Sequence, residues 1–266
     1  MIEINKIYNM DCAEGISLID DESVDLTITS PPYDNLRSYN GYLFDFEKVS
    51  NELFRVTKNG GIVIWVVGDS TINGSESLTS FKQALHFVDI GFNLHDTMIY
   101  QKINYIPLTH NRYEQSFEYM FCFSKGTPKT FNPIMIPCKN AGKIESYGSF
   151  RRSSLDRNQA MRAPEGLEYK VTKDFKIHPN IFSYTLGGEK TGHPAVFPNK
   201  LAYDQIVSWS NKNDLILDPF MGSGTVACMC KILNHNYIGF EISEEYCNLS
   251  NRRIKNTKVN KLKIGI

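Results

Sequence analysis

The chain has 266 residues, of which 41% are apolar and 22% are charged, with 29 basic and 29 acidic side chains. This length and composition fit one large globular domain, alone or with an insertion, and exclude a disordered chain. A net charge of zero gives no overall preference for a polyanionic partner. No apolar run is long enough to span a membrane, and no signal-peptide pattern opens the sequence, so we expect a cytoplasmic protein without a membrane partner.

Apolar periodicity predicts alternating strands and helices in the first half of the chain. Five short apolar runs have the composition of strands: residues 3–9, 24–29, 62–67, 97–102 and 117–123. Three segments have helical spacing: residues 13–19, 44–56 and a stripe of Leu78, Phe81, Leu85 and Val88. Alternation of this kind is typical of an α/β fold with a mostly parallel sheet.

The second half of the chain begins with a change of character. Periodicity fades between residues 126 and 190, and the stretch from Lys139 to Lys176 contains nine Lys or Arg residues against five Asp or Glu. A structureless loop of this length is improbable inside a compact domain, so we interpret it as an inserted functional segment. A helix over 199–210, a strand over 214–217, a helix from Val226 and a strand over 236–240 follow.

A glycine-rich turn follows the strand over 214–217. It reads Asp-Pro-Phe-Met-Gly-Ser-Gly-Thr from residue 218 to residue 225. Its glycines allow the backbone to approach a ligand closely at a helix N-terminus. Glu241 ends the next strand, 23 residues after Asp218, where an acid commonly accepts hydrogen bonds from ribose hydroxyls. The pattern therefore predicts a nucleoside-cofactor site. The alternative is a tight turn with a surface glutamate.

The six cysteines form no C-x-x-C pair and have no zinc-site spacing with histidine. We therefore expect reduced, structural thiols and no metal.

Thr-Ser-Pro-Pro-Tyr, residues 29–33, follows the strand over 24–29. The two prolines stop this strand, because neither can donate a ladder hydrogen bond. The strand end is where ligands bind in open α/β sheets, and the alternative is a rigid loop.

The two turns together resemble the S-adenosyl-L-methionine-dependent amino-methyltransferases of DNA. Weaker matches accompany them at 9–12, 55–61, 114–126 and 193–198. The resemblance implies a mostly parallel, doubly wound, seven-stranded sheet. The turn at 29–33 precedes the turn at 218–225, which is similar to the circularly permuted beta arrangement. Residues 1–125 would form the catalytic half, 126–190 the target-recognition region and 191–266 the cofactor-binding half of the same domain.

Site roles follow from the resemblance. The cofactor S-adenosyl-L-methionine would be bound by residues from four segments: Asp11, Cys12, Asp218, Pro219, Phe220, Gly222, Ser223, Gly224, Thr225, Glu241 and Ile242. Asp11 would accept from the adenine amino group, Glu241 would hold the ribose, and Ile242 would pack on the adenine. For Asp11 the alternative is a simple turn residue.

The catalytic residues implied by the resemblance are Ser30, Pro31, Pro32 and Tyr33. An exocyclic base amine is conjugated and poorly nucleophilic, so the site must align it with the methyl group and polarise its N–H bonds. The Ser30 hydroxyl and the Pro31 carbonyl would accept these hydrogens. Tyr33 would stack on a base flipped out of the duplex.

The implied substrate is double-stranded DNA. Arg151, Arg152, Arg157 and Arg162 would contact it. Ser before Pro-Pro-Tyr favours cytosine N4 over adenine N6. Methylation of RNA or of a protein amide, and a non-catalytic DNA-binding module, are the other readings. A homodimer and a restriction endonuclease acting on the same site are further expected partners.

Overall fold

The computed structural model describes residues 2–32, 45–105, 111–147, 168–185 and 198–259. The chain divides into two compact units. The first comprises Met1–Asn132 and Asn180–Ile266, and the second comprises Pro133–Pro179. The second unit is therefore an insertion in the first, and it lies within the segment 126–190.

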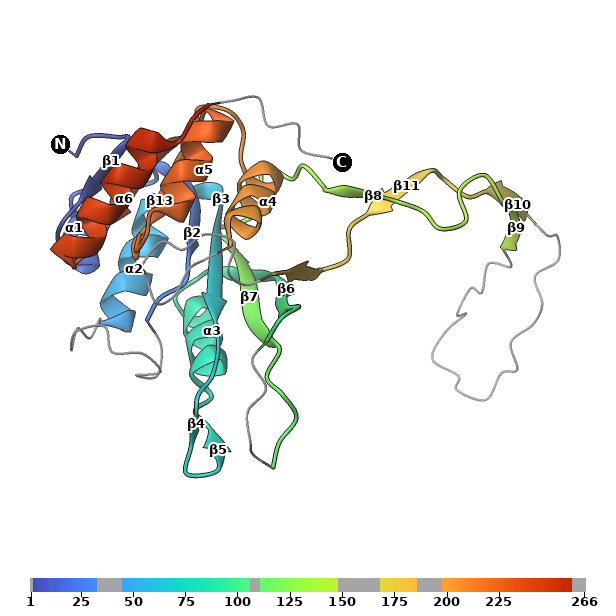
Figure 1. Cartoon of the computed structure of the whole chain (residues 1–266), viewed down its shortest axis with the longest axis horizontal. Coiled ribbons are helices and arrows are strands. Elements are labelled where there is room, and N and C mark those ends of the chain that lie inside the picture. The colour runs from blue at the N-terminus through green and yellow to red at the C-terminus, as the bar shows by residue number, and fades with distance from the viewer. Residues whose placement is uncertain (1, 33–44, 106–110, 148–167, 186–197, 260–266) are drawn as a thin grey trace. The chain divides into compact units, whose positions relative to one another are not determined.

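The first unit is built on an eight-stranded sheet of order β1-β14-β13-β2-β3-β7-β6-β12 (Figure 1). Its strands are β1 (Lys6–Tyr8), β14 (Asn236–Phe240), β13 (Leu215–Asp218), β2 (Val24–Thr29), β3 (Thr57–Val67), β7 (Phe117–Ser124), β6 (Asn93–Lys102) and β12 (Ile181–Tyr184). Only β7 pairs antiparallel with its neighbours, and the other pairs are parallel. The mostly parallel α/β fold predicted from the sequence is confirmed.

The number of strands differs from the sequence prediction of seven. The eighth strand is β12, which pairs in parallel with the edge strand β6. It lies inside the segment assigned to target recognition, where the apolar pattern was too short to predict a strand. Phe182 and Tyr184 are buried on one of its faces, while Ile181 and Ser183 are exposed on the other.

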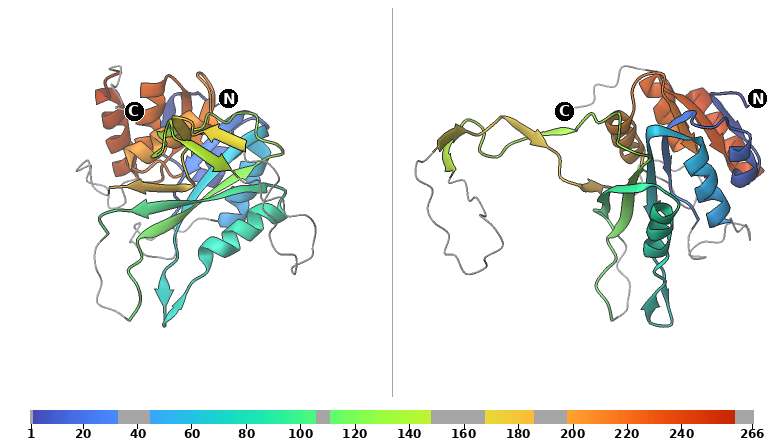
Figure 2. Two further views of the ribbon diagram at one scale, coloured as in Figure 1. Left: turned by 90° about the vertical axis from the view of Figure 1, so that its right-hand side faces the viewer. Right: turned by 180° about the vertical axis from the view of Figure 1, so that it is seen from behind.

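Six helices of the described chain cover the sheet: α1 (Cys12–Ser17), α2 (Phe46–Val56), α3 (Thr79–Asp89), α4 (Asn199–Trp209), α5 (Thr225–Leu233) and α6 (Glu244–Asn256). Helices α1, α2 and α3 share one core cluster with Val63, Trp65 and Val67 of β3. Successive residues of a strand point to opposite faces, so Ile64 and Val66 are buried on the other side. There α4 packs against β2 and α5, and α5 packs against α6 (Figures 1 and 2). The sheet is thus doubly wound.

Helix α3 does not bury the stripe that predicted it. Its buried residues are Ser80, Gln83, Ala84 and Phe87. Gln83 accepts a hydrogen bond of 2.8 Å from the indole N–H of Trp65. Phe87 lies edge-on to Trp65 and stacks on Phe123 at 4.6 Å between ring centroids. The aromatic core therefore selects the Phe87 face of α3 and leaves the Leu85 face outside.

Shorter strands form three two-stranded ribbons. In the first unit, β4 (Thr71–Ile72) and β5 (Ser75–Glu76) form a hairpin. Its turn residues Asn73 and Gly74 both have positive φ, as a type I′ turn requires. In the second unit, β8 (Met135–Pro137) pairs with β11 (Phe175–Ile177), and β9 (Ile144–Tyr147) pairs with β10 (Glu168–Val171). No helix in the described part of the chain has the length and apolar character needed to cross a lipid bilayer.

Candidate functional site

The segments predicted to form the site follow the carboxyl ends of neighbouring strands, at one edge of the sheet. Strands β1, β14, β13 and β2 are neighbours and all parallel, so their carboxyl ends lie side by side. Tyr8 is in register with Phe240, and Asp218 with Gly239. Helix α5 carries the chain from β13 to β14 on one face, and α2 carries it from β2 to β3 on the other. The topological switch therefore falls between β13 and β2, where open α/β sheets bind ligands.

A buried hydrogen bond joins the two motifs across this switch point. The Thr29 hydroxyl donates to Oδ1 of Asp218 at 2.7 Å, although the two residues are 189 positions apart. Both side chains are at most 5% exposed. The same Asp218 oxygen accepts from the backbone N–H of Phe220 at 3.1 Å. The last residue of β2, Thr29, is thus joined directly to Asp218, the first residue of the glycine-rich turn.

Two carboxylates give this edge an unusual charge state. Burial raises the pKa of Asp218 from its ordinary 3.8 to about 7, against the lowering effect of its hydrogen bonds from Thr29 and Phe220. The negative charge of Glu241 raises it further. Burial also raises the pKa of Glu241. Burial disfavours the ionised form of both carboxylates, so a cationic ligand at this edge would stabilise that ionised form.

Glu241 connects the turn to the following strand. Its Oε2 accepts from the backbone N–H of Gly222 at 2.8 Å, and its Oε1 accepts from that of Ser243 at 2.8 Å. Each carboxylate oxygen has a second lone pair, so these bonds leave acceptor capacity for a ribose hydroxyl. The sequence predicted Glu241 from its spacing, and the structure places it beside the glycine-rich turn.

The backbone of the turn requires its second glycine. Gly224 has φ of +79°, and a Cβ built on it would lie 2.7 Å from Cβ of Ser250 in α6. Its N–H donates to the carbonyl of Met221 at 2.8 Å. Any larger residue would push α6 away from the start of α5, so this glycine fixes the spacing of the two helices behind the turn.

Arg253 of α6 also holds the turn, and the sequence did not predict this role. Its Nη1 donates to the Ser223 carbonyl at 2.5 Å, to the Ser223 hydroxyl at 2.9 Å and to the Thr225 hydroxyl at 3.4 Å. Within the sequence, Arg253 was one of six basic residues near the C-terminus, and nothing distinguished it from its neighbours. Only the packing of α6 against α5 reveals the contact.

The residues that follow β1 and β14 form the other side of the edge. Asp11 Oδ1 accepts from the backbone N–H groups of Ala13 and Glu14 at 2.8 and 3.2 Å, which is a helix N-cap. Burial, with the charge of Asp11, raises the pKa of the Cys12 thiol to about 12, so Cys12 is an inert buried thiol. Ile242 follows Glu241 and is 38% exposed.

The Thr-Ser-Pro-Pro-Tyr turn, predicted to be catalytic, is described only in part. Ser30 is half-buried, Pro31 is buried and Pro32 is half-buried, whereas Tyr33 lies outside the described residues. The four arginines predicted to contact DNA also lie outside them: Arg151, Arg152, Arg157 and Arg162.

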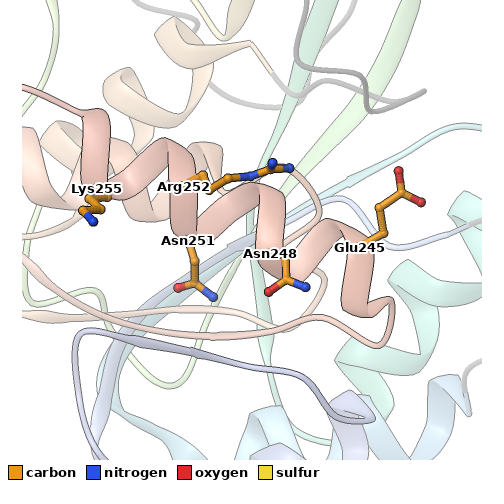
Figure 3. A pocket seen from close by; sticks show the side chains of 5 residues that line it. All are labelled: Glu245, Asn248, Asn251, Arg252 and Lys255. Carbon is orange, nitrogen blue, oxygen red and sulfur yellow. The ribbon is translucent and has the colours of Figure 1, made fainter.

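A surface hollow on α6 contains none of the predicted residues. It is lined by five side chains of that helix: Glu245, Asn248, Asn251, Arg252 and Lys255 (Figure 3). Two of these are basic and one is acidic. Among the described residues, no group of three or more His, Cys, Asp and Glu side chains is placed to hold a metal ion. The strand edge therefore remains the candidate site.

Comparison with known proteins agrees with this geometry. Residues 24–252 match the model of the N6/N4 DNA methylase family. The orphan methyltransferase M.BamHII of Bacillus amyloliquefaciens is 50% identical over 248 residues, which cover 90% of this chain and 91% of that protein. Other relatives, 24–27% identical, are named type II methyltransferases. This chain belongs to the DNA methylase family and is a DNA methyltransferase.

Two solved structures share the fold. The complex of M1.HpyAVI with S-adenosylmethionine has a TM-score of 0.60 at 23% identity, and the alignment covers 93% of this chain and 98% of that one. The cytosine-N4-specific PvuII DNA methyltransferase has a TM-score of 0.67 at 20% identity, with 97% and 88% covered. Membership of the family agrees with S-adenosyl-L-methionine as the cofactor predicted from the sequence.

Proposed function

We propose that this protein transfers a methyl group from S-adenosyl-L-methionine to the exocyclic amine of a flipped-out base at a specific DNA sequence, with cytosine N4 as the target. The hydrogen bond between Thr29 and Asp218 is the observation that carries this proposal. It fixes the amine-binding turn and the cofactor turn at adjacent strand ends, as transfer between two bound molecules requires. The catalytic turn comes first in the chain, which is the permuted beta order.

The cofactor fits the strand edge by charge. Its sulfonium and ammonium groups are cationic, and the two carboxylates with raised pKa values, Asp218 and Glu241, are stabilised by positive charge. Asp218 and the backbone from Gly222 to Thr225 would hold the methionine end, with Pro219 and Phe220 beside it. Glu241 would accept from the ribose, and Ile242 would pack on the adenine. Asp11 would face the adenine amino group with Oδ2, because Oδ1 caps α1.

Methyl transfer is then a direct displacement. The Ser30 hydroxyl and the Pro31 carbonyl accept the N–H hydrogens of the base amine, which directs the nitrogen lone pair toward the methyl carbon. The nitrogen–carbon bond forms as the carbon–sulfur bond breaks, and the amine then loses one proton to solvent. The cofactor supplies the methyl electrophile. Tyr33 stacks on the flipped base, and the step needs no covalent enzyme intermediate.

The choice of base rests on Ser30. The resemblance associates Ser before Pro-Pro-Tyr with cytosine N4, and the neighbour PvuII methyltransferase is described as cytosine-N4-specific. Adenine N6 is the alternative, because the matched family contains both activities. Methylation of RNA or of a protein amide is a weaker alternative, which family membership disfavours.

The partners follow from the same proposal. Duplex DNA would be read by the segment 126–190 through its arginines. A restriction endonuclease that cuts the same sequence is the partner expected if this chain works as the relatives named type II methyltransferases do. The relative at 50% identity is named an orphan methyltransferase, which favours a solitary enzyme. A second copy of the chain is also a partner.

Incubation of the protein with tritiated S-adenosyl-L-methionine and duplex DNA tests the proposal. We expect label in DNA, and nucleoside analysis should identify N4-methylcytosine. Predominant N6-methyladenine would contradict the assignment of Ser30 but keep the DNA activity. Label in RNA or protein and none in DNA would overturn the whole proposal.

A further inference from the structure

The side chain of Asn9 joins two turns that are far apart in the sequence. Asn9 follows β1, and its Nδ2 donates to the backbone carbonyls of Glu241 and Ile242, both at 2.9 Å. These two carbonyls belong to the turn between β14 and α6. An asparagine in a turn commonly bonds to backbone two residues further on, whereas these partners lie 232 and 233 positions away. The two bonds are therefore tertiary contacts.

This connection lies where two neighbouring strands separate. The parallel pairing of β1 and β14 ends with Tyr8 in register with Phe240. One more backbone bond follows, from the N–H of Glu241 to the carbonyl of Tyr8 at 3.0 Å. Beyond it the chain of β1 enters α1, which packs with α2, while the chain of β14 enters α6, which packs with α5 on the other face of the sheet. Backbone pairing cannot continue between diverging chains, so the Asn9 side chain makes the next connection.

The two contacts require the chemistry of an amide. The Asn9 nitrogen carries two hydrogens, so one atom can donate to two successive carbonyls. A serine or threonine hydroxyl has one hydrogen to donate, and an ionised aspartate has none. Because both hydrogens are used, the amide cannot rotate without breaking a bond. Asn9 is an exposed residue, so water competes for the same carbonyls and each bond contributes at the low end of the usual range.

The joined turns contain four of the residues predicted to bind the cofactor. Asp11 and Cys12 follow Asn9 within three residues, and Glu241 and Ile242 provide the accepting carbonyls. The two turns are close in space, because burial together with the negative charges of Asp11 and Glu241 raises the pKa of the Cys12 thiol to about 12. A change in the spacing of these turns would therefore move both sides of the predicted nucleoside site.

We propose that Asn9 is a positioning residue for the nucleoside end of S-adenosyl-L-methionine. It acts through the two turns that it joins, and it fixes the distance from Asp11 to Glu241 and Ile242. This inference rests on the proposed function, which assigns the adenine amino group to Asp11, the ribose to Glu241 and the adenine face to Ile242. The proposed methionine end has separate support, from Arg253 to the glycine-rich turn. Asn9 should therefore affect the nucleoside end selectively.

Ligand binding to the full chain tests this role. Asn9→Ala should weaken the binding of S-adenosyl-L-methionine by about 5-fold in calorimetry, since it removes two exposed hydrogen bonds. Methylthioadenosine keeps the nucleoside and lacks the amino-acid end, and its affinity should fall by the same factor. The turnover rate at saturating cofactor should stay at the wild-type value. Asn9→Asp keeps the shape of the side chain and removes both donors, so it should weaken methylthioadenosine at least as much, and it provides the test if Asn9→Ala fails to fold.

Asn5→Gly is the matched control. Asn5 joins the same two strands at their amino ends, where its Nδ2 donates to Oδ1 of Asn236 at 3.1 Å and its Oδ1 accepts from the N–H of Tyr237 at 3.2 Å. Its φ of 62° suits glycine, so the variant removes these bonds without backbone strain and should bind both ligands like the wild type. Arg253→Ala should instead weaken S-adenosyl-L-methionine more than methylthioadenosine.

Three results would each overturn the inference. They are an unchanged affinity of the Asn9 variants for methylthioadenosine, an equal loss of affinity in Asn5→Gly, and a lower turnover rate of Asn9→Ala at saturating cofactor. The wild type separates these results from the proposed function. A wild type that does not bind S-adenosyl-L-methionine would overturn the proposed function, whereas a wild type that binds it and methylates DNA while the Asn9 variants bind equally well would overturn this inference alone.

Discussion

The two turns of the proposed active site are held in different ways. The proposed cofactor turn after β13 has a hydrogen bond at most of its residues: Asp218 with Thr29, Gly222 with Glu241, Ser223 with Arg253 and Gly224 with Met221. The described end of the catalytic turn, from Thr29 to Pro32, is tied to the cofactor turn by the Thr29 hydroxyl. The glycine-rich turn is therefore preorganised by contacts along its length, whereas Thr29 is held by its pairing with Trp65 of β3 and by this one side-chain hydrogen bond.

This difference predicts which changes separate cofactor binding from methyl transfer. A substitution in the catalytic turn should reduce transfer and leave cofactor affinity intact. A substitution behind the cofactor turn should reduce affinity first. A substitution that removes the hydrogen bond between Thr29 and Asp218 should reduce both cofactor affinity and methyl transfer. The following experiments test this division.

The largest effect is expected for Tyr33→Ala. Loss of the stacking platform removes about 1–3 kcal/mol from base binding, and misalignment of the amine costs more, so the turnover rate should fall by at least about 100-fold. The dissociation constant for S-adenosyl-L-methionine, measured by calorimetry, should not change. Tyr33→Phe, which keeps the ring, should retain most of the activity. A loss of cofactor binding in Tyr33→Ala would contradict the assignment of the catalytic turn.

Arg253→Ala should weaken cofactor binding by about 10-fold, because hydrogen bonds from a charged donor contribute about 1.5–3 kcal/mol. We expect the effect in KM for the cofactor and little change in KM for DNA. Arg252→Ala is the control, since Arg252 is the next residue of α6 and lines the exposed hollow instead. Equal effects of the two substitutions would argue against a role for the hydrogen bonds from Arg253 to Ser223 and Thr225.

Thr29→Val should modestly reduce both cofactor affinity and the turnover rate. The substitution keeps the shape of the side chain but removes the Thr29 donor and leaves buried Asp218 with the backbone N–H of Phe220, which costs about 1–3 kcal/mol of stability. Thermal unfolding should report this loss, and both cofactor affinity and turnover should fall. Thr29→Ser, which keeps the hydroxyl, should behave like the wild type. A turnover defect with unchanged cofactor affinity would show that the bond positions only the catalytic turn.

The smallest effect concerns pH. The folded protein holds a proton on Asp218 up to about pH 7, whereas the unfolded chain releases it near pH 3.8. The free energy of unfolding should therefore fall as the pH rises through this window and level off above pH 7. Asp218→Asn should reduce this slope in the ligand-free protein without abolishing it, because the raised pKa of Glu241 acts in the same direction. Thermal unfolding between pH 5 and 8 measures both slopes.

The sequence could predict that these residues meet at one edge of the sheet, because each of them follows a strand. Asp218, Glu241 and Ser30 each follow an apolar run, and the rule for parallel sheets brings such positions to one edge. Arg253 could not be predicted in this way. Its contact with Ser223 depends on how α6 packs on α5, and a run of six basic residues gives no signal that distinguishes one of its two arginines.

Helices α2 and α3 show the limit of periodicity. Both were predicted from apolar residues at helical spacing, and both exist. In α2 three of the four residues with helical spacing, Val49, Leu53 and Val56, are buried and Phe46 is half-buried, whereas in α3 the predicted stripe is exposed. A periodic pattern indicates that a helix has an apolar face. It does not indicate what covers that face, which is decided by the fit of other residues, here Gln83 and Phe87.

Two asparagines of the first unit, Asn132 and Asn180, flank the second unit in the sequence. Asn132 donates through its side chain to the carbonyls of Val207 and Ser210 in and after α4. Asn180 donates to the carbonyl of Thr97 in β6 and accepts from the N–H of Ile99. These amides close the sheet domain on each side of the insertion. On the proposed assignment of this insertion to target recognition, exchange of residues 133–179 for those of a relative should change the DNA sequence that is methylated and leave the sheet domain intact.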